Sequence, residues 1–138
     1  MELGNNKTFI AALLAATNEN VSPIRSKCLE LFFHLSRLPR LSATLLENED
    51  IVSTLVNASN FSQLQDRLWS LRAFQNFSCA AVGRQTIMST TLLDNLTLSC
   101  MRKDSAEEQK AALAIIYNLT CDLGKYLNSS EHIPTKTS

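Results

Sequence analysis

Apolar residues recur at helical spacing in three long segments of the chain. In each segment they lie three or four residues apart: Ile24, Cys28, Leu31 and Leu35; Leu68, Leu71, Phe74 and Phe77; and Ala112, Ile115 and Leu119. This spacing places them on one face of an α-helix, where they can pack against a core. The pattern therefore predicts long helices over residues 22–37, 62–79 and 105–121.

Each predicted long helix begins with a residue pattern that is typical of helix N-termini. A serine is followed either by proline or, three residues later, by Gln or Glu: Ser22 with Pro23, Ser62 with Gln65, and Ser105 with Glu108. Serine accepts hydrogen bonds from the first backbone amides, proline suits the first helical position, and Gln or Glu completes a capping box. We therefore expect each helix to start at its serine.

Shorter helices are predicted between the long ones. Residues 39–47 and 83–89 have room for about two turns each. Apolar runs over 9–14, 51–56 and 92–97 align with one another and predict a further helix in each unit. The expected order is thus a partial unit followed by two complete sets of three helices.

A short pattern repeats at a constant interval. His-Leu-Ser begins at His34, Asn-Phe-Ser at Asn76 and Asn-Leu-Thr at Asn118, with 42 residues between successive copies. Leu29, Leu71 and Leu113 share another repeat position. A fixed period of this length is typical of stacked helical repeats.

The sequence therefore predicts an all-α solenoid of about three stacked repeats, with the three long helices side by side. Residues 1–127 form the repeats, divided into a partial repeat over 8–37 and full repeats over 38–80 and 81–122. Residues 128–138, which contain Pro134 and several Ser and Thr, predict a flexible tail. Leu71 and Leu113 should both be buried, because they occupy the same position in their repeats.

Composition and charge argue against several classes of function. Thirteen basic and thirteen acidic residues cancel, so the chain lacks the positive field that favours nucleic acid or an anionic membrane. No phosphate loop, nucleophile elbow or metal-ligand spacing occurs, and the two histidines offer little for acid–base catalysis. We expect no enzyme activity, cofactor, metal site or membrane span. The absence of a signal-peptide pattern predicts a cytoplasmic protein.

The repeated unit resembles the armadillo repeat, whose third helix ends in a small-Leu-x-x-Leu-x-Asn pattern. The sequence has Ser-Leu-Arg-Ala-Phe-Gln-Asn over residues 70–76 and Ala-Leu-Ala-Ile-Ile-Tyr-Asn over residues 112–118. The first copy, residues 28–34, has His34 in place of the Asn. The resemblance implies a protein-interaction module whose Asn ladder hydrogen-bonds an extended peptide in a concave groove.

Carried onto this chain, the resemblance gives a candidate partner-binding groove. Its residues are His34, Trp69, Arg72, Asn76 and Asn118. Two roles stay open for the Asn residues, which could contact a ligand or bridge neighbouring helices. Trp69 could anchor a partner or pack between repeats, and Arg72 could belong to a charged patch or to a solvated helix face.

One feature of peptide-binding armadillo proteins is missing. Those proteins place Trp one turn before the Asn, where this chain has Glu30, Arg72 and Ala114. Without these aromatic slots, binding of a nuclear-import signal is not expected.

The end of the chain also resembles the C-terminal armadillo-like end of the rotatin family, which are large proteins of centriole and basal-body assembly. The similar stretches lie over residues 74–76, 111–118 and 125–129. This resemblance implies a fragment of a large scaffold located at the centrosome or centriole. The alternatives are a free-standing armadillo adaptor, a regulatory segment of another scaffold, or a helical nucleic-acid-binding module.

The first predicted helix should expose apolar side chains. Phe9, Ile10, Leu13 and Leu14 have no preceding repeat to cover them, and this segment lacks the polar cap that terminal repeats normally carry. We therefore expect this N-terminal edge to be covered by upstream repeats of a longer parent chain or by self-association.

Overall fold

The regular structure of the chain is entirely α-helical in the residues that the structure describes. The computed structural model describes residues 7–19 and 21–130. The helices there are α1 (Lys7–Thr17), α2 (Ser22–Ser36), α3 (Pro39–Leu46), α4 (Glu49–Ala58), α5 (Leu64–Phe77), α6 (Ala81–Met88), α7 (Leu92–Met101) and α8 (Ala106–Ser130). The all-α class predicted from the sequence is confirmed.

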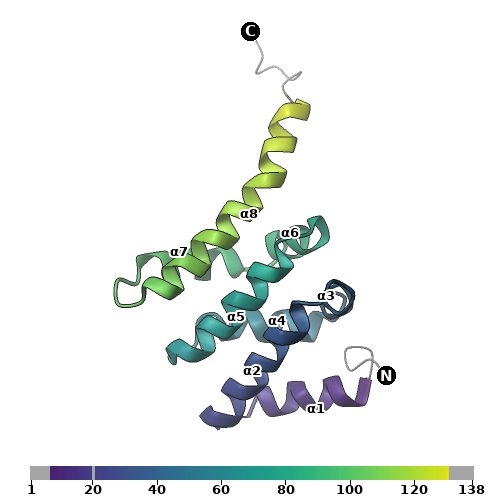
Figure 1. Ribbon diagram of the computed structural model, residues 1–138, viewed down its shortest axis with the longest axis vertical. Coiled ribbons are helices and arrows are strands. Elements are labelled where there is room, and N and C mark those ends of the chain that lie inside the picture. The colour runs from purple at the N-terminus through teal and green to yellow at the C-terminus, as the bar shows by residue number, and fades with distance from the viewer. Residues whose placement is uncertain (1–6, 20, 131–138) are drawn as a thin grey trace.

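The three long helices follow one another in space. Helix α2 packs along α5, and α5 packs along α8 (Figure 1). Helices α1, α4 and α7 pack against α2, α5 and α8 respectively, while the short helix α3 contacts α6. The side-by-side placement predicted for residues 22–37, 62–79 and 105–121 is therefore present.

Helix α2 begins at Ser22 and α8 directly after Ser105, as the sequence predicts, whereas α5 begins two residues after Ser62. Ser105 Oγ accepts a hydrogen bond from the Glu108 amide at 3.1 Å, as in a capping box. Helix α2 instead has Val21 as its N-cap, and α5 has Gln63, neither with a side-chain cap bond. The Ser62 box does not form, because α5 begins two residues later and the Ser62 carbonyl accepts from Arg67 Nη1 at 3.0 Å.

Helix α8 is longer than predicted. It runs to Ser130, beyond the end expected near Cys121, so residues 128–130 of the predicted tail are helical. Residues 131–138, the rest of that tail, lie outside the described residues.

A continuous apolar core runs through the packed helices. The residue equivalent to Leu71 in α8 is exposed and does not belong to this core. Leu29 and Leu71 are fully buried, whereas Leu113 is 57% exposed. The predicted burial of Leu71 is confirmed and that of Leu113 is wrong. Helix α5 is flanked by the units before and after it, but no described element covers the side of α8 that carries Leu113.

Helix α1 is covered better than the sequence predicted. Ile10 and Leu13 are buried at 6% and 8% exposure, and Phe9 and Leu14 are half-buried against the core. The exposed edge predicted at Ile10 and Leu13 is therefore wrong, because α1 turns these side chains toward α2 and α4.

Candidate partner-binding surface

The two predicted Asn residues make the same contact in successive units. Asn76 Nδ2 donates to Ser36 Oγ at 2.9 Å, and Asn118 Nδ2 donates to Ser78 Oγ at 2.9 Å. Each amide thus bonds the hydroxyl that ends the three-residue pattern of the preceding unit. Of the two roles left open by the sequence, bridging between helices is therefore realised.

The hydroxyls that accept these bonds are themselves held in place. Ser36 Oγ donates to the Phe33 carbonyl at 2.6 Å, and Ser78 Oγ donates to the Gln75 carbonyl at 2.8 Å. With its hydrogen committed to the helix backbone, each oxygen presents lone pairs to the Asn amide. In both contacts the Asn side chain bonds through its Nδ2 atom.

Trp69 belongs to an aromatic cluster at the junction of α2 and α5. Its ring centroid lies 5.3 Å from that of Phe33 and 6.4 Å from that of His34. The Arg72 guanidinium lies 5.4 Å above the Trp69 ring, and the Arg37 guanidinium lies 5.8 Å above the Phe33 ring. Trp69 therefore packs between repeats, and two cations flank the cluster.

The edges of this aromatic cluster carry polar side chains that are partly open to solvent. The side chains of His34 and Arg72 are 51% and 32% exposed. His34 Nε2 lies 3.5 Å from Glu30 Oε2, and Arg72 Nη2 donates to Glu107 Oε2 at 3.1 Å. Such exposed pairs contribute little to stability and can exchange partners.

The structure brings some of the predicted site residues together. His34, Trp69 and Arg72 form one group, through the ring and guanidinium contacts described above. Asn76 lies farther along α5, where it lines a separate cavity of about 360 Å³ with Ser36, Arg37 and Cys79. Asn118 lies at the next junction, beside Ser78.

Sequence analysis missed a second repeated contact, between arginine and acid. Arg25 Nε donates to Asp66 Oδ2 at 2.9 Å, and Arg67 donates to both Glu108 oxygens at 3.0 Å each. Both pairs span 41 residues. The sequence did contain a signal for these pairs. Each arginine is followed 41 residues later by an acidic residue, which is one residue less than the repeat period.

Glu108 is the centre of the larger charged network. It is fully buried, and its Oε2 atom also accepts bonds from Ser99 Oγ at 2.9 Å and from Arg102 Nη1. Burial acts to raise the pKa of Glu108, but the hydrogen bonds from Arg67, Arg102 and Ser99 outweigh it, so the pKa lies below its usual value. The network holds α8 against α5 and α7.

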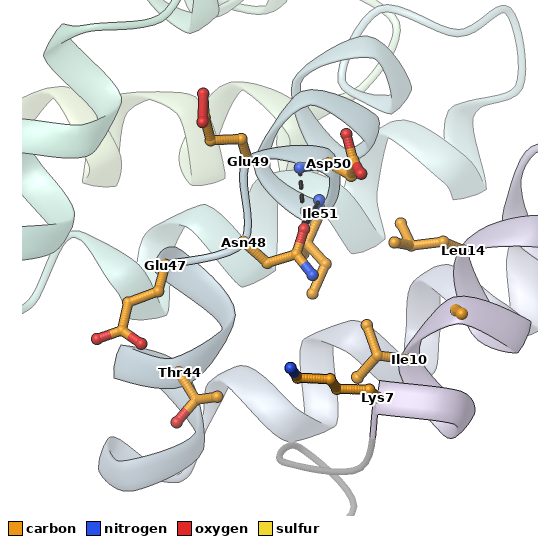
Figure 2. Close-up of a pocket in the computed structure, with 10 residues that line it drawn as sticks. Lys7, Ile10, Leu14, Thr44, Glu47, Asn48, Glu49, Asp50 and Ile51 are labelled. Carbon is orange, nitrogen blue, oxygen red and sulfur yellow. Dashed lines mark hydrogen bonds between the residues drawn. The ribbon is translucent and has the colours of Figure 1, made fainter.

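Another cavity lies apart from these residues. It has a volume of about 720 Å³ between α1, α3 and α4 and contains none of the predicted site residues. Figure 2 shows apolar Ile10, Leu14 and Ile51 on one side and acidic Glu47 and Glu49 on another.

Local helix structure accounts for three of the polar residues that line this cavity. Asn48 caps α4 by accepting from the amides of Asp50 and Ile51 at 2.9 and 3.2 Å. Glu49 and Asp50 lie in the first turn of α4, where the helix dipole stabilises negative charge. These side chains therefore serve the start of the helix and define no ligand.

Two further features bear on function. Among the described residues, no three His, Cys, Asp or Glu side chains are placed to hold a metal ion. Within the same part of the chain, every helix is too short or too polar to cross a bilayer.

Comparison with known proteins gives no assignment. No protein-family model matches the chain, and no curated protein matches its sequence significantly.

Proposed function

We propose that this chain is a non-enzymatic protein-interaction module with an armadillo-like solenoid architecture. The observation that carries the proposal is the recurrence of the same contacts at both junctions between long helices. An Asn–hydroxyl bond and an Arg–acid pair join α2 to α5, and equivalents 42 residues later join α5 to α8. Repeated units that contact only their neighbours build extended surfaces suited to binding other proteins.

The proposed binding surface is the exposed edge of the long helices around the aromatic cluster. His34, Trp69 and Arg72 form its centre, and Asn76 and Asn118 extend it along the stack. Arg37 and Arg72 place cations over aromatic rings, an arrangement that favours a partner segment with acidic side chains. The partner is thus a protein or peptide, and nucleic acid is disfavoured by the neutral net charge.

The resemblance to the rotatin family extends the proposal to a cellular role. On that basis the chain is part of a large cytoplasmic scaffold of centriole and basal-body assembly, located at the centrosome. A free-standing armadillo adaptor is the second candidate, because the interaction surface requires only the repeats themselves.

Affinity capture with matched variants tests the proposal. Wild-type chain, Arg72→Glu, Asn76→Ala/Asn118→Ala and a control, Met88→Ser, are used as baits in cell extract, and bound proteins are identified by mass spectrometry. Met88 is 59% exposed at the end of α6 and is not one of the residues of the proposed surface. A partner should bind wild type and the control and bind Arg72→Glu more weakly, with the difference fading at high salt.

The same experiment can reject the proposal. If all four baits retain the same proteins equally, the edge of α2, α5 and α8 is not the binding surface. Fluorescent tagging of the chain tests the cellular role separately, since a signal that never meets a centriole marker removes the centriolar assignment and leaves the adaptor alternative.

A further inference from the structure

The outer face of α8 is the counterpart of a face that is buried in α2 and α5. Leu113 is 57% exposed, whereas Leu29 and Leu71 at the same repeat position are fully buried. Tyr117, one turn further on, is 72% exposed. This face has the side chains of an internal junction, and no helix in the described part of the chain packs on it.

The outer face of α2 is also exposed, although the equivalent faces of α5 and α8 are buried. Ile24 and Leu31 are 50% and 37% exposed. The residues at their repeat positions in α5 and α8 are all buried: Asp66, Ala73, Glu108 and Ile115. This face borders a groove of about 440 Å³ lined by Leu13, Pro23, Ile24, Lys27, Cys28 and Leu31. The face thus corresponds to the side of α5 and α8 that receives the preceding helix.

We propose that the chain assembles head to tail with second copies of itself, with α8 of one copy packed on α2 and the α1–α2 groove of the next. The internal junctions α2–α5 and α5–α8 provide the template. The exposed face of α8 corresponds to the first helix of each junction, and the exposed face of α2 corresponds to the second. The proposal rests on the stacked-repeat architecture proposed above, and it shares His34 with the proposed partner-binding surface.

The repeated hydrogen bond supports this pairing. Thr120 Oγ1 donates to the Tyr117 carbonyl at 2.6 Å, as Ser36 and Ser78 do one turn back in their own helices. Thr120 therefore presents its lone pairs as the internal acceptors do. His34 occupies the Asn position of α2, and an imidazole N–H is a suitable donor to that hydroxyl.

The aromatic contact also has a counterpart at the proposed junction. Within the chain, the Phe33 ring of α2 packs on Trp69 of α5 with centroids 5.3 Å apart. Tyr117 holds the position of Phe33, and Lys27 of the next copy holds that of Trp69. The Lys27 side chain is 82% exposed, so its stem and ammonium can lie over the Tyr117 ring as a cation–π contact.

The charged pair of the internal junctions is missing at the ends. Gln109 holds the position of Arg25 and Arg67, and Ile24 holds the position of Asp66 and Glu108. The contact between copies is therefore mainly apolar, and its affinity should depend only weakly on salt. Because the two faces differ, the contact is heterologous and produces open chains of copies that lengthen with concentration.

Sedimentation velocity over a concentration series tests the proposal on the full chain. Wild type should form dimers and longer species as concentration rises. Tyr117→Asp blocks the α8 face and Ile24→Asp blocks the α2 face, and each should raise the dissociation constant about tenfold or more. Because each variant keeps one intact face, their equimolar mixture should form dimers and nothing longer.

Controls separate association from folding and from partner binding. Val82→Asp changes an exposed apolar residue in the first turn of α6, as Ile24→Asp does in α2, and should associate like wild type. Lys27→Glu tests the aromatic contact without altering an apolar side chain and should also weaken association. Circular dichroism checks that every variant is folded, and Tyr117→Asp should still capture a partner that requires Arg72.

Three results would each overturn the proposal. The first is a wild-type chain that stays monomeric at its highest soluble concentration. The second is a single-face variant that still associates like wild type, and the third is a mixture of the two variants that stays monomeric. Any of them leaves the partner-binding surface around Trp69 untouched.

Discussion

The α2–α5 and α5–α8 junctions contain the same types of contact, but they differ in how many polar and how many aromatic contacts they have. At α2–α5, Arg25 bonds one oxygen of Asp66, and the buried Oδ1 atom of Asp66 has no hydrogen-bond partner among the described residues. At α5–α8, Arg67 bonds both oxygens of Glu108, and Ser99 and Arg102 join them. The later junction therefore has the more complete polar network.

Aromatic contacts show the opposite trend. Phe33 and Trp69 stack across α2–α5, and the Arg25 guanidinium lies 4.9 Å above the Phe61 ring. Across α5–α8 the corresponding positions hold Gln75 and Ala111. The difference teaches that one repeat geometry can be held mainly by rings and apolar area or mainly by a buried ionic network.

Neutralising each acid gives the largest expected difference between the junctions. Glu108→Gln should cost about 3–5 kcal/mol, because it leaves two arginines facing a neutral amide in the core. Asp66→Asn should cost less, about 1.5–3 kcal/mol, since only one arginine loses its charged partner there. Urea denaturation followed by circular dichroism measures both. Equal costs, or a larger cost at Asp66, would contradict the ranking of the two networks.

Truncating the equivalent leucines separates a covered junction from an uncovered face. Leu71→Ala should cost about 2–5 kcal/mol, because it opens a cavity in a fully buried site. Leu113→Ala removes a side chain that is 57% exposed, so its cost should stay within about 0.5 kcal/mol. Thermal unfolding at low protein concentration checks both values without interference from self-association. A midpoint lowered as far by Leu113→Ala as by Leu71→Ala would mean that α8 is covered in solution.

Acid should weaken the α5–α8 junction through Glu108. Its pKa in the folded chain is lowered from 4.5, so the unfolded state binds the proton more readily. The resulting stability is present above pH 4.5 and is lost as the pH falls through the lower, folded-state value. Unfolding free energies of wild type and Glu108→Gln, measured from neutral pH downward, should therefore converge in acid. A difference that stays constant to the lowest pH at which both fold would contradict this.

Sequence periodicity was sufficient to predict the order of the helices and the succession of the long ones. It succeeded because apolar spacing is a local property of each helix, and the long helices pack in the order in which they occur along the chain. It failed at Leu113, because repeat equivalence predicts burial only where a neighbouring unit is present. It also assigned the Glu108 side chain to a capping box with Ser105, whereas the carboxylate turns inward to Arg67, a contact that only the tertiary arrangement creates.

The candidate site was predicted in part. The period placed Asn76 and Asn118 in equivalent positions, and the structure gives them equivalent bonds. Their hydroxyl partners belong to the repeated three-residue pattern and were therefore visible in the sequence. The sequence did not show that each Asn bonds the hydroxyl of the preceding unit, because this depends on how the helices pack. The rings beside Trp69 come from another helix and could not be placed from sequence spacing alone.

The smallest expected difference between the two junctions concerns the Asn–hydroxyl bond that they share. Double-mutant cycles of Asn76 with Ser36 and of Asn118 with Ser78, all changed to Ala, should each give a coupling energy of about 1 kcal/mol. The two values should agree, because both bonds are 2.9 Å long and join the same atom types. Chemical denaturation of the single and double variants measures them. A coupling present at one junction and absent at the other would show that the surrounding rings or charges, and not the repeated bond, set the register of the stack.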